Sequence, residues 1–363
     1  MNYSQYIIYL PYRLIWNLKK LMRILFHKDI DIVFYCGTPV DYVVVKNVIE
    51  LLPRCRIVAK NRKIRNVLIN NYGINKCGLY PAYPDVLIAT RHIARKFPEK
   101  QMMKFGMRHG AYHFKDFVSA KRYNAFDYFL VTSQKEVELA VQKGIYNAVA
   151  VGFPKLDDAF NGKISINDLT ELKNELSLDP KKPTIIFTAT WEKSGMSAVE
   201  KWADRLSELV GDYNVLVTLH SWVTDKNRMI IKMNHQIHYI ESKTILPYLM
   251  ISDVMVGDIS SIIAEFCALD KPIITFRTGR GKRTNDDILE MLDQISFRVD
   301  SFEELTRALK NAITDPGYHS NARNNYNKIM FDELDGNASI RAATFIGKKL
   351  KVNEGILDQG DSK

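Results

Sequence analysis

One short segment constrains the fold of this chain more than any other. Residues 254–276 read Val-Met-Val-Gly-Asp-Ile-Ser-Ser-Ile-Ile-Ala-Glu-Phe-Cys-Ala-Leu-Asp-Lys-Pro-Ile-Ile-Thr-Phe. This pattern predicts a strand, a polar turn, a helix over 259–268 and a second strand, as in parallel α/β folds. Ser260 and Ser261 would open the helix, where unpaired backbone N–H groups and the helix dipole attract an anion. Asp258 and the serines could instead serve only as helix caps.

The rest of the chain alternates short β-branched runs with amphipathic stretches, which indicates repeated βαβ units. Strands of a first sheet are expected at 32–35, 56–59, 85–89, 104–107, 128–131 and 148–151. Strands of a second sheet are expected at 184–187, 214–217, 237–240, 253–256 and 273–276. Closing helices are expected at about 301–313, 318–330 and 337–350. The sequence therefore predicts an α/β fold with two doubly wound, Rossmann-like domains facing across a cleft.

Composition shifts suggest where these domains begin and end. The predicted parts are a basic amphipathic segment at 1–28, an N-terminal domain at 29–160, a polar linker at 161–182, a C-terminal domain at 183–335, and a terminal helix and tail at 336–363. A chain of 363 residues is long enough for two domains that each bury a core.

The amino-terminal segment mixes apolar and basic residues without an apolar run long enough to span a bilayer. One helical stripe carries Leu14, Leu18, Leu21 and Leu25, whereas another carries Arg13, Asn17 and Lys20. This pattern favours a helix in a membrane interface, with Trp16 and several tyrosines at headgroup depth. A helix that packs on the protein's own core is the alternative. A signal peptide is disfavoured because no small-residue cleavage site follows.

Charge and cysteine usage narrow the class of partner. The 51 Lys and Arg residues against 41 Asp and Glu give a net charge of +10, which favours nucleotides, phosphorylated polymers, nucleic acid or an acidic membrane. Nucleic acid is the least expected of these, since the basic residues are scattered along the chain. The four cysteines have no metal-ligand spacing and are expected to be reduced thiols of a cytosolic protein. No phosphate-loop, dinucleotide-fingerprint or paired-aspartate metal motif occurs, so neither a cofactor nor a metal is expected.

Two histidines stand where ligands bind in parallel sheets, just after the carboxyl ends of strands. His109 follows the strand that ends near Met107, and Gly110 after it would let a substrate approach the backbone. His220 ends the run Val215–Leu219, where an imidazole could bond a phosphate. Either histidine could instead have only a structural role.

Five stretches in order resemble the CDP-glycerol glycerophosphotransferase family, which builds the glycerol-phosphate chains of teichoic acids and related capsules. Gly-Asp-Ile-Ser-Ser with the trailing Leu-Asp-Lys-Pro-Ile is similar to the family's S-D-Y-S-S…L-D-K-P-I signature. The other four are Arg108-His109-Gly110 with Lys115, Val151-Gly152-Phe153-Pro154-Lys155-Leu156-Asp157, Thr188-Ala189-Thr190-Trp191, and Asp335-Gly336-Asn337-Ala338-Ser339-Ile340-Arg341. Together they span roughly residues 105 to 345.

The resemblance implies a GT-B architecture and a role for each candidate residue. In the N-terminal acceptor domain, His109 would deprotonate the acceptor hydroxyl. In the C-terminal CDP-donor domain, His220 would stabilise the phosphate charge, with the donor bound by Asp258, Ser260, Ser261 and Glu265. Glu265 would reach ribose hydroxyls, unless it is an exposed helix residue. Asp258 is expected to orient a hydroxyl or a histidine, because an acidic side chain is a poor direct partner for phosphate.

Three departures from the family pattern concern the neighbours of these residues. The run from Ala111 to Lys115 is one residue longer than usual and lacks the family's proline, and it also contains His113. Ser221 follows His220 where the family has proline. Lys155 replaces arginine, which keeps the charge but loses the bidentate fork.

The expected function is transfer of glycerol 3-phosphate, or a related polyol phosphate, from CDP-glycerol to a hydroxyl of a lipid-linked glycan or polymer, with release of CMP. The expected location is the cytoplasmic face of the cell membrane, as a peripheral protein bound to an anionic surface. One alternative is a GT-B glycosyltransferase or epimerase that uses a UDP-sugar, since fold alone does not decide function. Another is a non-catalytic protein that binds an anionic polymer or a membrane.

Overall fold

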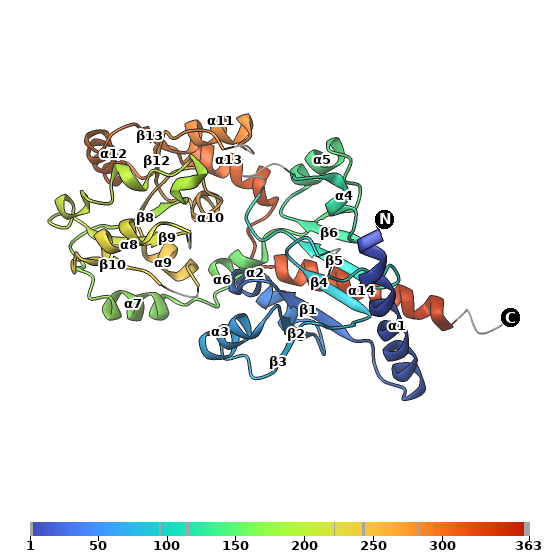
Figure 1. Cartoon of the computed structure of the whole chain (residues 1–363). Helices are drawn as coiled ribbons and strands as arrows, with labels where there is room; N and C mark the ends of the chain where they lie inside the picture. The colour runs from blue at the N-terminus through green and yellow to red at the C-terminus, as the bar shows by residue number, and fades with distance from the viewer. Residues whose placement is uncertain are drawn as a thin grey trace. The chain divides into compact units, whose positions relative to one another are not determined.

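The computed structural model describes residues 3–93, 96–112, 117–220, 222–241, 244–281 and 284–358. The chain divides into two compact units, coloured mainly blue to green and green to orange in Figure 1. The first unit comprises residues 1–109, 117–157 and 337–363. The second comprises residues 110–116 and 158–336. The chain therefore leaves the first unit twice, for residues 110–116 and for residues 158–336, and returns to it for its final helix.

The first unit is built on a seven-stranded parallel sheet of order β3-β2-β1-β4-β5-β6-β7. Its strands are β1 (Ile32–Cys36), β2 (Arg56–Ala59), β3 (Cys77–Leu79), β4 (Val86–Ala89), β5 (Met103–Met107), β6 (Tyr128–Val131) and β7 (Ala148–Ala150). Its helices are α1 (Tyr3–Leu25), α2 (Pro39–Glu50), α3 (Arg62–Tyr72), α4 (Ala120–Tyr123), α5 (Gln134–Gln142), the turn η1 (Pro154–Leu156) and α14 (Ala338–Asp358). The short α6 (Asp157–Phe160) follows where the chain leaves this unit.

The second unit holds a six-stranded parallel sheet of order β10-β9-β8-β11-β12-β13. Its strands are β8 (Thr184–Ala189), β9 (Asn214–Leu219), β10 (Ile237–Tyr239), β11 (Val254–Gly257), β12 (Ile273–Phe276) and β13 (Phe297–Val299). Its α-helices are α7 (Ile166–Glu175), α8 (Asp225–Lys232), α9 (Leu246–Ile251), α10 (Ile262–Cys267), α11 (Asp286–Ile295), α12 (Phe302–Thr314) and α13 (Ser320–Phe331). Three 3₁₀ turns are η2 (Glu192–Ser194), η3 (Val199–Lys201) and η4 (Leu206–Glu208).

These two parallel-sheet units confirm the predicted α/β, Rossmann-like fold class. The central strands were predictable because a parallel sheet is covered on both faces, so its strands read as continuous apolar runs. Strands β3 and β13 were not predicted; both lie at sheet edges and span only three residues. Gly78 and Arg298 interrupt the apolar pattern of these two strands.

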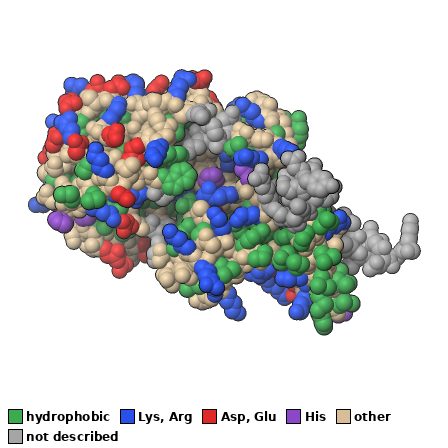
Figure 2. Space-filling view, viewed as in Figure 1, with side chains coloured by type: hydrophobic (Ala, Val, Ile, Leu, Met, Phe, Trp, Pro, Cys, Tyr) green, Lys and Arg blue, Asp and Glu red, His purple; other side chains and the backbone are tan. Residues whose placement is uncertain are grey.

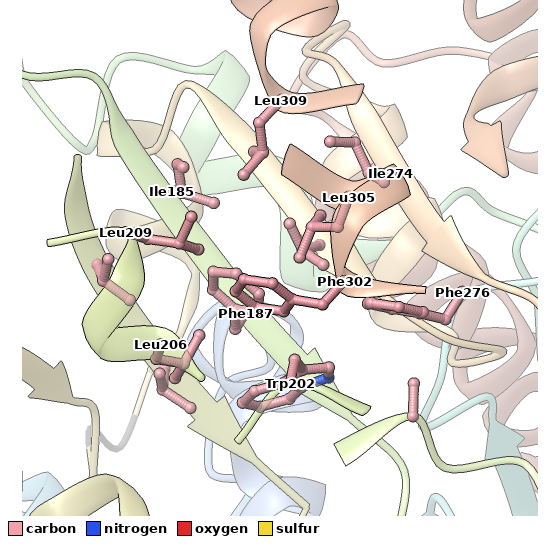
Figure 3. Close-up of a cluster of buried hydrophobic side chains, with 14 of the residues drawn as sticks. Ile185, Phe187, Trp202, Leu206, Leu209, Ile274, Phe276, Phe302, Leu305 and Leu309 are labelled. Carbon is pink, nitrogen blue, oxygen red and sulfur yellow. The ribbon is translucent and has the colours of Figure 1, made fainter. Parts of the chain in front are cut away.

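The core of the second unit lies between its sheet and the helices on one face. Figure 3 shows Phe187 of β8 and Phe276 of β12 packed with Trp202 and with Leu305 of α12. Trp202 is fully buried and its ring centroid lies 5.1 Å from that of Phe187. Burying large aromatic and aliphatic side chains contributes about 1.5–3 kcal/mol each, so this cluster holds the sheet rigid beneath the loops at its edge.

Helix α1 packs on the first unit through a narrow aromatic face. Trp16 is 1% exposed and its indole N–H donates to the Pro84 carbonyl at 2.6 Å. The Tyr12 hydroxyl donates to the Ala82 carbonyl at 2.7 Å. The prediction that Trp16 lies at headgroup depth is therefore wrong. The indole ring is buried in the first unit, and its N–H group hydrogen-bonds to a protein carbonyl. In the part of the chain that the structure describes, no helix is sufficiently long and apolar to cross a bilayer.

The opposite face of α1 is apolar and uncovered. Exposed fractions are 74% for Leu14, 60% for Leu18, 52% for Leu21 and 62% for Leu25. These are the leucines that share one helical stripe in the sequence. A monomeric protein rarely exposes so many contiguous apolar side chains without a binding role. One face of α1 thus packs on the protein, as the second alternative predicted, and binding of the exposed face to a membrane stays a prediction.

Each sheet is doubly wound and has one point where the chain order reverses. In the first unit this point lies between β1 and β4, and in the second between β8 and β11. Ligands in such sheets bind outside the carboxyl ends of the strands at this point. A functional site is therefore expected among the residues that follow these strands.

Candidate active site

In the second unit, Asp258 follows β11 and Thr190 follows β8, the two strands at the reversal point. The Asp258 side chain is fully buried, and its Oδ2 accepts from the Thr190 N–H at 2.8 Å and hydroxyl at 3.0 Å. The Ala198 N–H donates to the same oxygen at 3.2 Å. Burial raises the pKa of Asp258 to about 6, because desolvation disfavours the carboxylate more than these hydrogen bonds favour it. Asp258 thus closes the loop 190–198.

The turn that follows Asp258 is tighter than predicted. Helix α10 begins at Ile262 and not at 259, because the first helical carbonyls accept from only three residues ahead. Ile263 N–H donates to the Ser260 carbonyl at 3.0 Å, and Ala264 N–H donates to the Ser261 carbonyl at 3.2 Å. This first turn is therefore of 3₁₀ type. Both serine side chains stay half-exposed at the turn.

Glu265 points away from solvent. Its side chain is 3% exposed, so the alternative of an exposed helix residue is wrong. It lies on the first turn of α10, whose buried residues include its neighbours Ala264 and Phe266. Glu265 is therefore packed inside the second unit beneath this turn, where a carboxylate needs polar partners.

Residues 110–116 group with the second unit, and Gly110 passes close to Ser261. A Cβ atom at position 110 would lie 3.1 Å from Ser261 Oγ, which is closer than ordinary van der Waals contact. Glycine therefore allows the segment to approach the serine turn. The predicted residues His113 and Lys115 lie outside the described part of the chain.

His220 follows β9 and is surrounded by two tryptophans. Its ring centroid lies 5.0 Å from that of Trp191 and 5.2 Å from that of Trp222. The Trp222 backbone N–H donates to His220 Nδ1 at 3.2 Å. His220 is exposed and Trp191 is half-buried, so Trp191 is not a simple core residue. The imidazole is thereby presented to solvent with its orientation restrained.

In the first unit, His109 lies at the carboxyl end of β5, beside β4. It is exposed on one side and hydrogen-bonds to the Thr90 backbone. Desolvation by the surrounding chain, followed by the charge of Arg91, lowers its pKa below the ordinary value. Asp41 opposes this shift without cancelling it. His109 is therefore a neutral imidazole at physiological pH, the form that accepts a proton.

Two buried carboxylates pair with arginines near His109, of which Arg108 belongs to a motif named above and Arg91 was not predicted. Arg91 Nε donates to Asp41 Oδ1 at 2.8 Å, and Asp41 also accepts from the Gly37 and Thr38 N–H groups. On the other side, Arg108 pairs with Glu136, which is 0% exposed. The available signal was position, since Arg91 stands two residues after a strand. The carboxylate partners Asp41 and Glu136 both lie in the first turn of a helix, where an acidic residue is common and does not by itself indicate a site.

Two of the five motifs serve to hold the first unit together. Asp157 Oδ1 accepts from Ala338 N–H at 3.1 Å and Oδ2 from Ser339 N–H at 2.6 Å, which caps α14. Arg341 Nε donates to the Val151 carbonyl at 3.0 Å. The G-x-P-K-x-D motif and the D-G-x-A-S-x-R motif are thus partners of each other.

The basic loop after β12 is partly neutralised. Arg277 Nη1 lies 2.9 Å from Asp300 Oδ2, and Arg280 Nη1 lies 2.7 Å from Asp286 Oδ1. Both pairs are exposed and contribute little to stability. Lys282 and Arg283, which continue this loop, lie outside the described residues.

Residues 94–348 match the model of a known family, described as CDP-glycerol:poly(glycerophosphate) glycerophosphotransferase. The chain belongs to this family. The match confirms the family predicted from the five motifs, and with it the class of enzyme, the phosphotransferases. None of the comparisons tests the individual site residues, so the roles of His109, His220, Asp258, Ser260, Ser261 and Glu265 stay predictions.

Two curated relatives are named as teichoic acid polymerases. The teichoic acid ribitol-phosphate polymerase TarK of Staphylococcus aureus is 25% identical over 211 residues, which cover 54% of this chain and 41% of TarK. The teichoic acid poly(ribitol-phosphate) polymerase of Bacillus spizizenii is 24% identical over 211 residues, 54% of this chain and 33% of that protein. The matched region thus takes in less than half the length of either relative.

Several solved structures share the fold of this chain. The wall teichoic acid polymerase TagF matches with a TM-score of 0.69 at 14% identity, covering 97% of this chain and 99% of the TagF chain. The UDP-GlcNAc 2-epimerase of Neisseria meningitidis matches with a TM-score of 0.61 at 13% identity, covering 88% and 100% of the two chains. These likenesses establish the two-unit Rossmann-like fold.

Proposed function

We propose that this family member transfers glycerol 3-phosphate, or a related polyol phosphate, from a CDP-activated donor to a hydroxyl of a lipid-linked glycan or polymer in teichoic acid or capsule synthesis. Family membership supports the reaction class, and relatives named as ribitol-phosphate polymerases support a CDP-polyol donor. A TagF variant soaked with CDPG has the same fold, with a TM-score of 0.67 at 15% identity over 95% of this chain and 99% of that chain.

The observation that carries the proposal is a neutral imidazole at the carboxyl end of β5. In the proposed step, His109 accepts the proton of the acceptor hydroxyl while the oxygen of that hydroxyl forms a bond to the β-phosphorus of the donor. The bond from that phosphorus to the bridging oxygen breaks, and CMP leaves with the electron pair. The lowered pKa keeps His109 unprotonated before each turnover, which supports this role.

The polar turn of the second unit is proposed as the donor side. Ser260 and Ser261 present half-exposed hydroxyls where a phosphate can be bonded, and His220 stands exposed after β9. Positioned donors that stabilise charge supply most of the catalysis in phosphoryl transfer. Asp258 supports these groups without contacting the donor, because its carboxylate is fully buried and accepts a hydrogen bond from Thr190. Glu265 is buried and supports the same turn.

We further propose that α1 rests on an anionic membrane surface, so that the protein acts as a peripheral enzyme at the cytoplasmic face. Figure 2 shows hydrophobic side chains gathered along α1 with Lys and Arg side chains nearby. The helix is held to the protein through Trp16, which leaves the leucine stripe available to lipid. Exposed apolar and basic side chains on one helix are typical of interfacial binding.

The decisive experiment is CMP release by the purified protein from CDP-glycerol and CDP-ribitol, with a lipid-linked disaccharide acceptor. We expect turnover of one CDP-polyol and a loss of at least about 10²-fold in His109→Ala. His235→Ala is the matched control, because His235 is an exposed histidine outside the site and should retain activity.

A second candidate is a sugar-nucleotide enzyme, favoured only by the likeness to the UDP-GlcNAc 2-epimerase fold. UDP-sugars are therefore assayed in parallel with the CDP-polyols. Turnover of a UDP-sugar without CMP release would replace the proposed function. Tight binding of polymer or vesicles without any turnover would identify the protein as a non-catalytic binder.

A further inference from the structure

The surroundings of His220 specify which of its nitrogens carries the proton. The Trp222 backbone N–H donates to Nδ1 at 3.2 Å, so Nδ1 must present its lone pair. A neutral imidazole has one N–H group, and its proton then lies on Nε2.

Two rings hold the imidazole in this orientation. Trp191 and Trp222 lie 4.9 Å apart between ring centroids at an angle of 76°, and His220 contacts both. Aromatic pairs in such tilted and edge arrangements stabilise each other beyond the area that they bury. We call these three side chains the aromatic triad. Trp222 is 67% exposed, so its ring is not held by the core.

Glu192 links the two loops that carry the triad. Its Oε1 accepts from the Thr224 hydroxyl at 2.7 Å and from Asn227 Nδ2 at 2.7 Å. The Thr224 N–H also lies 3.2 Å from both carboxylate oxygens. Glu192 follows Trp191 directly, whereas Thr224 comes two residues after Trp222. A single carboxylate therefore fixes the separation of the two tryptophans.

The loop that carries Glu192 is fixed in turn by Asp258, which binds the N–H groups of Thr190 and Ala198. On the other side, Arg228 Nη2 donates to the His220 carbonyl at 3.0 Å. The position of His220 thus depends on hydrogen bonds that run back to β8, β11 and α8. Such support is what holds a reacting group to the accuracy that catalysis needs.

We propose that His220 acts in the transfer as a neutral hydrogen-bond donor through Nε2, with Glu192 and Trp222 as the residues that position it. This inference rests on the proposed function and specifies the chemistry of one of its residues. In the step described above, the acceptor proton goes to His109 and CMP leaves with the electron pair of the broken P–O bond. The Nε2 proton stays on His220 and bonds an oxygen of the phosphoryl group or of CMP.

Amide replacements test which nitrogen acts. His220→Gln places an amide nitrogen near the position of Nε2, whereas His220→Asn places one near Nδ1. We expect His220→Gln to retain a kcat about 10-fold or more above that of His220→Asn, because only glutamine can replace the Nε2 donor. Equal values, or a higher kcat for His220→Asn, would overturn the proposal.

Substitutions at Trp222 separate the backbone donor from the ring. Trp222→Pro removes the N–H that contacts Nδ1, whereas Trp222→Ala keeps that N–H and removes the ring. We expect the proline variant to lose about 10-fold more kcat than the alanine variant, with KM for the donor changed less than kcat. Glu192→Gln should lower kcat in the same way. A proline variant as active as the alanine variant would contradict the positioning role.

A spectroscopic measurement keeps the proposal testable if the proline variant folds poorly. Long-range ¹H–¹⁵N spectra of wild-type protein labelled at histidine report each tautomer directly, and the His220 signal is the one missing in His220→Gln. We expect an unprotonated Nδ1 and a protonated Nε2 at neutral pH. The opposite tautomer in a protein that releases CMP overturns this inference alone. Absence of CMP release from every CDP-polyol overturns the proposed function, and the catalytic role of His220 with it.

Discussion

The Thr190 hydroxyl and N–H both donate to Asp258 Oδ2, and this shared acceptor joins two motifs that lie 68 residues apart in the chain. Thr190 follows β8 and Asp258 follows β11, so the bond forms where the order of the sheet reverses. Its consequence is a closed loop, 190–198, which places Trp191 beside His220 and Glu192 against Thr224 and Asn227. The motifs are therefore parts of one constellation and not separate binding sites.

Removing the Asp258 carboxylate should destabilise the protein in a pH-dependent way. Asp258→Ala leaves the Thr190 and Ala198 N–H groups without their acceptor, which costs about 3 kcal/mol of unfolding free energy in total. The raised pKa means that the folded state binds a proton more readily than the unfolded state. The stability advantage of wild type over the variant is therefore fully present below the unfolded pKa of 3.8, and it decreases as pH rises from there to about 6.

Urea unfolding of both proteins across this pH range measures the difference. Asp225→Ala is the matched control, since the Asp225 side chain is 97% exposed. A wild-type advantage that stays constant or grows as pH rises would contradict the inferred pKa of Asp258.

The acid limb of the activity profile should report His109. Because the pKa of His109 is lowered, kcat/KM should persist below pH 6.5, where an unperturbed histidine would already be protonated. Arg91→Gln removes the nearby cation that disfavours the imidazolium, so the acid limb should move to higher pH. Initial rates of CMP release between pH 4.5 and 8 measure this shift. An acid limb that does not move in the variant would show that Arg91 does not act on the titrating group.

The leucine stripe of α1 should be needed for membrane binding and not for folding. A triple Leu14→Ser, Leu18→Ser and Leu21→Ser variant removes three exposed apolar side chains, each of which contributes about 1.5–3 kcal/mol when buried in lipid. Binding to phosphatidylglycerol vesicles should fall by at least about 10²-fold in a flotation assay, with the thermal midpoint unchanged. Ile166→Ser, at an 82% exposed isoleucine of the second unit, is the control. Undiminished vesicle binding would assign the stripe to another partner.

A side chain at position 110 should disturb the serine turn, and the disturbance should be reversible. Gly110→Ala places a Cβ atom 3.1 Å from Ser261 Oγ, so the turn must shift by a few tenths of an ångström. We expect about a 10-fold loss of kcat/KM, because small displacements of positioned groups are costly in catalysis. The double variant with Ser261→Ala removes the clashing oxygen. In the Ser261→Ala background, Gly110→Ala should therefore reduce kcat/KM by a smaller factor than it does in the wild-type background. Equal factors in the two backgrounds would exclude the contact.

Sequence patterns alone specified the sheets and the family. The central strands are continuous apolar runs, and the order of the motifs along the chain needs no three-dimensional information. His109 and His220 were recognised because each follows a strand, a position that periodicity reveals. The edge strands β3 and β13 were not predicted, because three residues that include a glycine or an arginine show too little hydrophobic pattern.

Only the tertiary structure decided what each polar residue does. The buried carboxylates Asp41, Glu136 and Asp258 each have a partner far away in the chain, respectively Arg91, Arg108 and Thr190, and no local pattern records such a pairing. The same holds for Trp16, whose burial depends on an acceptor at Pro84 and not on the periodicity of its helix. Hydrophobic periodicity is a local property that can be read directly from the sequence. Hydrogen bonds and desolvation depend on which distant segments come into contact, and these contacts form only when the chain folds.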